Sequence, residues 1–156
     1  MDSAPDPSLK LWVVMNHAFN SIEERLRQQV ESHGMSFSEF AVLEVLLHKG
    51  PLPIGDVGDR VLLTSGSMTY VVDKLEERGL IGRRPCAEDR RIIYAELTEQ
   101  GRELIEGVFE EHSALIRRLT GALSPAEQET MINLLKRLGK SAEGKEATEK
   151  EATDAV

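Results

Sequence analysis

The fold is decided by residues 62–101, which read LLTSGSMTYVVDKLEERGLIGRRPCAEDRRIIYAELTEQG. A helix is predicted over about 65–78, because Thr64 is a good capping residue and Gly79 can adopt the left-handed backbone that ends a helix. The face of this helix that we expect to be buried carries Met68, Val71, Val72 and Leu75. The first turn of the helix carries only small and hydroxylated residues, so its tip can approach another surface closely.

A two-stranded ribbon is predicted directly after this helix. Residues 81–85 and 92–97 have the partial alternation and the β-branched side chains, at Ile81, Ile92 and Ile93, of a hairpin, and the polar segment 86–91 joins them. The ribbon carries Arg83 and Arg84 on one strand and Arg90 and Arg91 at its tip. A helix followed by a ribbon of this kind is typical of a winged helix-turn-helix, a module that holds duplex DNA.

Three helices are predicted before the decisive stretch. Apolar residues recur at steps of three and four over 9–34, which indicates a long amphipathic first helix. Ser36 and Glu39 have the spacing of a capping box, in which each residue bonds the backbone amide of the other, so a second helix should begin there. A short third helix is predicted over about 54–62.

Two further helices are predicted after the ribbon. Thr98 should cap the fifth helix, and Ser124 with Glu127 should open the sixth. The apolar residues of the fifth helix fall at alternating steps of three and four, a heptad-like seam that predicts packing against another helix. This seam comprises Ile105, Val108, His112, Leu115 and Leu119.

The predicted fold class is mainly α with a small β-wing (α+β), with six helices and a two- to three-stranded antiparallel sheet. We expect a flexible arm at 1–8 and the winged helix-turn-helix region at 35–98. Helices at 9–34 and 99–140 flank this region. Residues 141–156 contain no large apolar side chain apart from the final valine, so we expect a disordered tail there.

The charge of the chain is unevenly distributed. The net charge is −8 over 156 residues, yet the window 60–91 contains seven basic and five acidic residues and is net positive by two. An acidic body with a locally basic face suppresses indiscriminate phosphate binding and orients the protein toward the duplex. The overall negative charge therefore does not exclude DNA as a partner.

The outward face of the helix at 65–78 supplies the expected groove contacts, because a helix tip fits the major groove and its amides favour phosphate. We expect contacts from Thr64, Ser65, Ser67, Thr69 and Tyr70, with Lys74 on phosphate. The alternative is that the small hydroxylated residues only cap the helix.

The tip of the ribbon supplies a second set of expected contacts. Arg84, Arg90 and Arg91 can lie along the backbone of the duplex, and an arginine at such a tip can enter a narrow minor groove. Asp89 should hold a neighbouring guanidinium by a charge-assisted hydrogen bond. The alternative for Arg83 or Arg90 is a solvated surface charge.

With these segments in view, the chain resembles the MarR family of transcriptional regulators over about residues 9–140. The resemblance is carried by LTSGSMTYVVDKLEERGLI, by DRR at 89–91 and by LTEQG at 97–101. It implies a homodimer whose first, fifth and sixth helices intertwine as dimerisation helices, with two winged modules on a pseudo-palindromic DNA operator. It also implies that Arg91 enters the minor groove with Asp89 as its support.

Within the family, LLTSGSMTYVVDKLE with PCAEDRR is similar to the repressors that respond to quinones and catechols. The family resemblance implies a small phenolic effector bound between the dimerisation helices and the winged module. Residues that could line such a pocket, each of which could instead be core, are Trp12, Met15, His17, Phe19 and Phe40. Cys86, at the predicted tip near several arginines, is either a target for electrophiles or an incidental surface thiol.

Other classes of protein are disfavoured by the sequence. There is no glycine-rich phosphate loop, nucleophile elbow or plausible Ser, His and Asp set, so we expect neither an enzyme nor a cofactor. The four histidines have no paired spacing with one another or with the single cysteine, so we expect no metal site. With no long apolar run and no signal-peptide pattern, a cytoplasmic protein without membrane contact is expected. A winged helix that binds only other proteins remains the alternative function.

Overall fold

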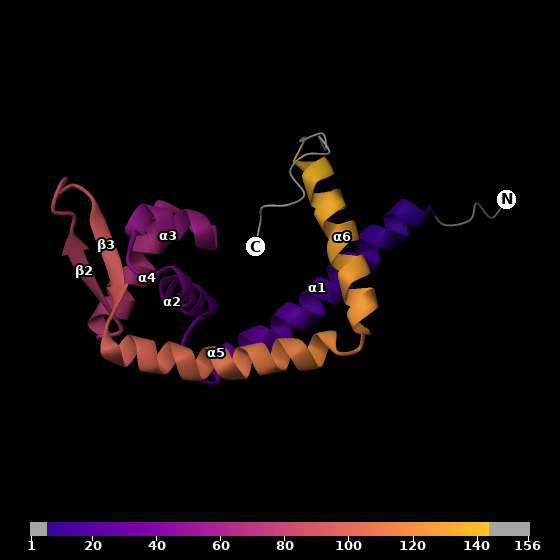
Figure 1. Ribbon diagram of the computed structural model, residues 1–156, viewed down its shortest axis with the longest axis horizontal. Coiled ribbons are helices and arrows are strands. Elements are labelled where there is room, and N and C mark those ends of the chain that lie inside the picture. Colours follow the sequence, from indigo (N-terminus) through magenta and orange to yellow (C-terminus); the bar gives the residue numbers. More distant parts are fainter. Residues whose placement is uncertain (1–5, 144–156) are drawn as a thin grey trace. The chain divides into compact units, whose positions relative to one another are not determined.

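The computed structural model describes residues 6–143 (Figure 1). The elements are α1 (Pro7–Glu31), α2 (Phe37–Lys49), β1 (Leu52–Pro53), α3 (Ile54–Val61), α4 (Ser65–Glu77), β2 (Ile81–Pro85), β3 (Ile93–Leu97), α5 (Glu99–Thr120) and α6 (Pro125–Ala142). The predicted class, six helices with a small antiparallel sheet, is confirmed. The chain divides into two compact units, one up to Ile116 and one from Arg117 onward.

Helix α1 begins two residues earlier than the sequence predicts. The Asp6 carboxylate accepts a hydrogen bond from the Ser8 amide at 2.8 Å, and Pro7 occupies the first helical position, where its missing amide costs nothing. Residues 7 and 8 are therefore helical, whereas the sequence places them in a flexible arm. Helix α6 likewise extends to Ala142, so the first two residues of the predicted tail at 141–156 are helical. Residues 1–5 of the arm and 144–156 of the tail lie outside the described residues.

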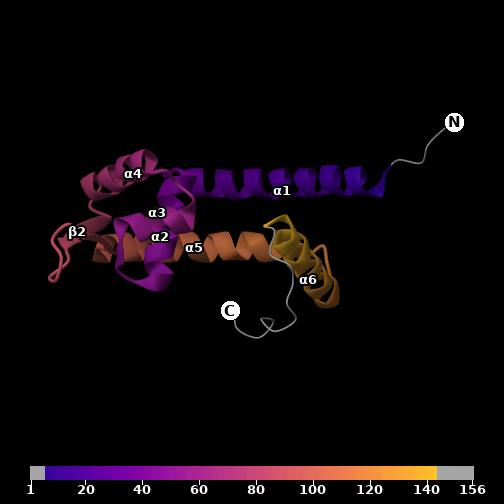
Figure 2. The same ribbon diagram turned by 90° about the horizontal axis from the view of Figure 1, so that it is seen from above.

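The sheet has three strands in the order β1-β3-β2, and all its pairs are antiparallel. Ile81 pairs with Leu97 and Arg84 with Tyr94, so β2 and β3 form the predicted ribbon, which we call the wing together with its loop at 86–92. The two residues of β1 add a third strand, with Leu52 opposite Ala95. The wing and α4 lie at the same end of this unit (Figure 2).

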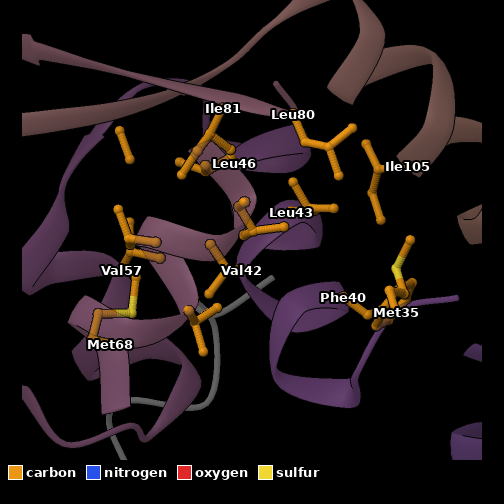
Figure 3. Close-up of a cluster of buried hydrophobic side chains, with 14 of the residues drawn as sticks. Met35, Phe40, Val42, Leu43, Leu46, Val57, Met68, Leu80, Ile81 and Ile105 are labelled. Carbon is orange, nitrogen blue, oxygen red and sulfur yellow. The ribbon is translucent and has the colours of Figure 1, made fainter. Parts of the chain in front are cut away.

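The core of the first unit joins the helices to the root of the wing. Figure 3 shows Leu43 and Leu46 of α2 among side chains from α3, α4, β2 and α5. Gly101 in the first turn of α5 lies so close to the backbone before β2 that an added Cβ would be 1.8 Å from the Leu80 carbonyl oxygen. Only glycine fits at this crossing, which fixes α5 against the wing.

Hydrogen bonds at helix ends close the same region. The Thr98 hydroxyl donates to the Gly79 carbonyl at 2.6 Å and accepts from the Gly101 amide at 3.0 Å, as expected of a helix cap. Gly79 has a φ of +69°, the left-handed exit that its position after α4 requires. Both predicted capping boxes are present, at Ser36 with Glu39 and at Ser124 with Glu127.

The seam of α5 packs against other helices of the same chain. Ile105, Val108, His112 and Leu115 are buried in a single chain. His112 bonds Gln29 of α1, with Nδ1 and Oε1 3.0 Å apart, and its ring lies 4.5 Å from that of Phe40. The heptad-like spacing therefore reflects packing of α5 against α1 and α2 of the same chain, and His112 belongs to that core.

In the second unit, α6 presents an apolar face that one chain leaves uncovered. The large apolar side chains on this helix are each between 42% and 54% exposed. They are Met131, Ile132, Leu134, Leu135 and Leu138. Near the start of α6, the Gln128 side-chain amide donates to the carbonyls of Thr120 and Leu123, both at 3.1 Å, and closes the turn after α5. Within residues 6–143, no helix combines the length and apolar character needed to span a membrane.

Candidate nucleic-acid interface

Helix α4 packs one apolar face into the core and exposes the opposite face to solvent. Met68, Val71, Val72 and Leu75 are buried as predicted, and the Thr64 hydroxyl accepts a hydrogen bond from the Ser67 amide at 3.3 Å. The residues that the sequence assigns to the groove, Thr64, Ser65, Ser67, Thr69, Tyr70 and Lys74, are all exposed. Core packing and exposure therefore leave the whole predicted contact face accessible.

The hydroxyl groups of this face are partly ordered by local hydrogen bonds. The Thr64 hydroxyl donates to Ser67 Oγ at 3.0 Å, so the Ser67 hydroxyl hydrogen can point outward. The Thr69 hydroxyl donates to the Ser65 carbonyl at 3.0 Å, which leaves the Thr69 oxygen as an acceptor. The helix tip thus offers both donors and acceptors at fixed positions, as reading of base edges requires.

Lys74 and Tyr70 lie one helical turn apart and interact. The Lys74 ammonium is 4.9 Å from the centre of the Tyr70 ring, and hydrogen bonding to Tyr70 raises the pKa of Lys74. Lys74 is therefore a permanent cation on the exposed face of α4, suited to a phosphate.

The wing loop holds one arginine in a defined orientation. Asp89 Oδ1 accepts from the amide and the Nε of Arg91 at 3.0 and 3.1 Å, and Oδ2 accepts from Nη2 at 3.0 Å. The hydrogen bonds from Arg91 lower the pKa of Asp89, and the same pair raises the pKa of Arg91. The Arg91 side chain is nevertheless 91% exposed. The predicted pair of Asp89 and Arg91 is thus present, with the guanidinium aimed away from the core.

The two arginines of β2 have different roles, which the sequence could not separate. Arg84 lies over the Tyr94 ring at 5.4 Å and donates to Glu96 at 3.4 Å, but it stays about half exposed on the outer surface of the wing. Arg83, one residue earlier and on the opposite side of the strand, bonds Asp73 at 2.5 Å and also bonds Glu76. Arg83 therefore ties the wing to α4, and the hydrogen bond that it donates to Asp73 raises the pKa of Arg83.

A second ion pair, also missed from the sequence, fixes the C-terminal end of α4 to α2. The Glu39 carboxylate closes its capping box by accepting from the Ser36 amide at 2.7 Å and also accepts from Arg78 Nη1 at 3.2 Å. Glu39 is almost completely buried, so its second oxygen needs this partner. The spacing of Ser36 and Glu39 revealed the cap, but nothing local in the sequence points from Glu39 to Arg78.

The remaining predicted residues of the wing lie on its loop. Arg90 is exposed, while Cys86 is half-buried rather than fully exposed. The Cys86 amide donates to the Ile92 carbonyl at 2.8 Å, so this residue forms part of the loop closure.

The residues proposed from the resemblance as an effector pocket do not form one surface in a single chain. Phe40 is buried in the core against Phe37 and His112. In contrast, Trp12 is 61% exposed, His17 and Phe19 are exposed, and Met15 is half-buried on α1. A ligand that touched Phe40 and Trp12 together would therefore need surfaces beyond those that one chain encloses.

An exposed helix tip beside an arginine-bearing wing, on this order of helices and strands, defines a winged helix-turn-helix DNA-binding protein. Residues 33–92 match the model of the MarR family. The transcriptional regulator MhqR of Bacillus subtilis strain 168 is 43% identical over 137 residues, which cover 88% of this chain and 94% of MhqR. The chain belongs to the MarR family and is a DNA-binding transcriptional regulator.

Two other known proteins are similar to this chain. The transcriptional repressor MdtR of Bacillus subtilis strain 168 is 25% identical over 143 residues, 92% of each chain. Among solved structures, the MarR family regulator AbsC of Streptomyces coelicolor superposes with a TM-score of 0.81 at 21% identity, covering 92% of this chain and 99% of AbsC. The latter likeness establishes the fold.

Proposed function

We propose that the protein is a homodimeric, sequence-specific repressor that binds a pseudo-palindromic operator and is released by a small phenolic, quinone-like or electrophilic effector. The observation that carries the DNA-binding part is the exposure, at one end of the fold, of the α4 tip and of Arg91 on the wing. In this proposal the α4 tip enters the major groove, and Arg91 enters the adjacent minor groove.

The homodimer is supported by apolar surface that folding of one chain leaves exposed. Leu9, Leu11, Trp12, Val13 and Val14 are each more than half exposed, although they surround the N-terminal part of α1 on several sides. A helix segment that is apolar on several sides is normally buried. The exposed apolar face of α6 is a second such surface. A second copy of the chain that covers both surfaces would place two α4 tips on one duplex, as a two-fold operator requires.

The effector class is supported by the resemblance of LLTSGSMTYVVDKLE to repressors that respond to quinones and catechols, and by the thiol in the wing loop. Two routes are open to such a ligand: a reversible phenolic site near α1, and covalent addition of the Cys86 thiol to a quinone. Replacement of Cys86 by serine separates them. If release by quinones persists in Cys86→Ser, the covalent route is excluded and the reversible one stands.

The proposed function is tested by selecting bound fragments from the parent genome and measuring affinity for the recovered sequence. Sequence-specific binding should exceed binding to random duplex by at least about a thousandfold. Binding to both should weaken steeply as salt rises, because phosphate contacts release counterions. No recovered sequence and no salt-dependent binding to any duplex would refute the proposal and favour a module that binds proteins.

A further inference from the structure

Leu62 is the residue whose placement the fold explains least. It lies in the turn between α3 and α4 and is 91% exposed. Its backbone is left-handed, with a φ of 58° and a ψ of 37°, and within residues 6–143 it is the one residue other than glycine with a positive φ. A large apolar side chain thus stands in water on a backbone that disfavours it.

Local folding would be served better by another residue at this position. The amides of Leu62 and Leu63 both donate to the Gly58 carbonyl, the latter at 3.0 Å, which is the usual way of ending a helix with one left-handed residue. Glycine or asparagine normally occupies that position. The apolar contact that accompanies such an ending is made by Leu63, which packs against the core. Neither the turn nor the core therefore needs a leucine at 62.

Leu62 comes directly before the proposed DNA-binding face in the chain, in a closely packed turn. An added Cβ on Gly58 would lie 3.4 Å from Met68 Cγ, so α3 and α4 pack closely on either side of the turn. Leu62 is two residues before Thr64, and the exposed tip from Thr64 to Ser67 follows at once. The apolar side chain is thus continuous in sequence with hydroxyl groups suited to base edges.

A duplex offers two apolar surfaces at such a position. One is the C5 methyl group of thymine, which projects into the major groove, and the other is the deoxyribose at the rim of the groove. We propose that Leu62 makes an apolar contact with the operator, through one of these two groups, when the α4 tip enters the groove. This inference rests on the proposed function and adds to it a residue that recognises DNA without a hydrogen bond.

The test compares two substitutions on the full-length protein. Leu62→Asn removes the apolar group but suits the left-handed backbone, whereas Leu62→Met keeps an apolar side chain of similar reach. We expect Leu62→Asn to raise the melting temperature by up to about 4 °C while weakening operator binding about tenfold. Leu62→Met should bind within about twofold of the wild type. A purely structural residue would not show opposite changes in stability and affinity.

Replacing operator thymines one at a time by uracil, which lacks the C5 methyl group, identifies the surface contacted. If a thymine methyl is the partner, one replacement should weaken the wild type and leave Leu62→Asn unaffected. If the deoxyribose is the partner, every uracil operator should show the same ratio of wild-type to variant affinity as the thymine operator.

The inference is overturned if Leu62→Asn binds the operator as tightly as the wild type does, or if it lowers the melting temperature and affinity together. These results are distinct from failure of the proposed function, in which the wild-type protein itself would bind no operator.

Discussion

The strongest test of the wing is the loss of Arg91. Its side chain is 91% exposed and bonds Asp89 of the same loop, so truncation to alanine removes little of the packing that stabilises the fold. We expect the melting temperature to change by less than about 2 °C. Operator affinity should fall roughly 5- to 150-fold, the range expected when an arginine that contacts DNA is truncated. The large effect on binding beside a small effect on stability is the signature to look for.

The assay is fluorescence anisotropy with the recovered operator and with random duplex at several salt concentrations. Arg102→Ala is the matched control, because Arg102 is an exposed arginine on α5 that pairs with Glu106 at 3.8 Å and carries the same charge. Asp89→Asn should show part of the Arg91 effect, since it keeps the shape but weakens the bond that orients the guanidinium. Equal affinity of Arg91→Ala and Arg102→Ala would refute a role for the wing in recognition.

Three further predictions concern the scaffold. Leu135→Glu should give monomers by sedimentation and lose operator binding while the first unit stays folded, because Leu135 is 47% exposed in one chain. A charge at Leu115, which is only 6% exposed, would unfold the chain instead. A Leu135→Glu protein that remained a dimer would place the interface elsewhere. Gly101→Ala should lower the free energy of unfolding in denaturant by about 3 kcal/mol, because the new Cβ meets the Leu80 backbone. The control is Gly107→Ala on the same helix, where a Cβ meets nothing within 4 Å, and this change should be neutral or stabilising. Equal effects of the two substitutions would contradict the close crossing. Burial lowers the pKa of His112, so the unfolded chain binds a proton at this histidine more readily than the folded chain does. The free energy of unfolding should therefore be highest above pH 6.5 and should fall by up to about 1.4 kcal/mol per pH unit as the pH decreases below that value. His112→Gln should flatten this decline, and identical pH profiles of variant and wild type would show that another group causes it.

Features that depend on neighbours in sequence were predictable. The limits of α4 and β2, both capping boxes and the left-handed Gly79 follow from residues within a few positions of one another, where steric and hydrogen-bonding preferences act directly. For the same reason the pair of Asp89 and Arg91, two residues apart, was expected. The early start of α1 at Pro7 shows that helix ends are less certain than helix existence.

Features that depend on tertiary folding were not predictable in this way. The partners of Arg83 lie 7 and 10 residues away and meet it only after the wing has folded back on α4. The seam of α5 is another case, because heptad spacing is the same whether the facing helix belongs to the same chain or to a second copy. Strand β1, with only two residues, is too short to produce any periodic signal.

The close crossing at Gly101 has a mechanical consequence. With no clearance between the first turn of α5 and the Leu80 backbone, α5 cannot slide past the root of the wing. Thr98 bonds both sides of the same junction, so a tilt of this turn must carry β2 and its arginines with it. The junction is therefore rigid, so a small rotation of the first turn of α5 should produce a larger displacement at the tip of the wing.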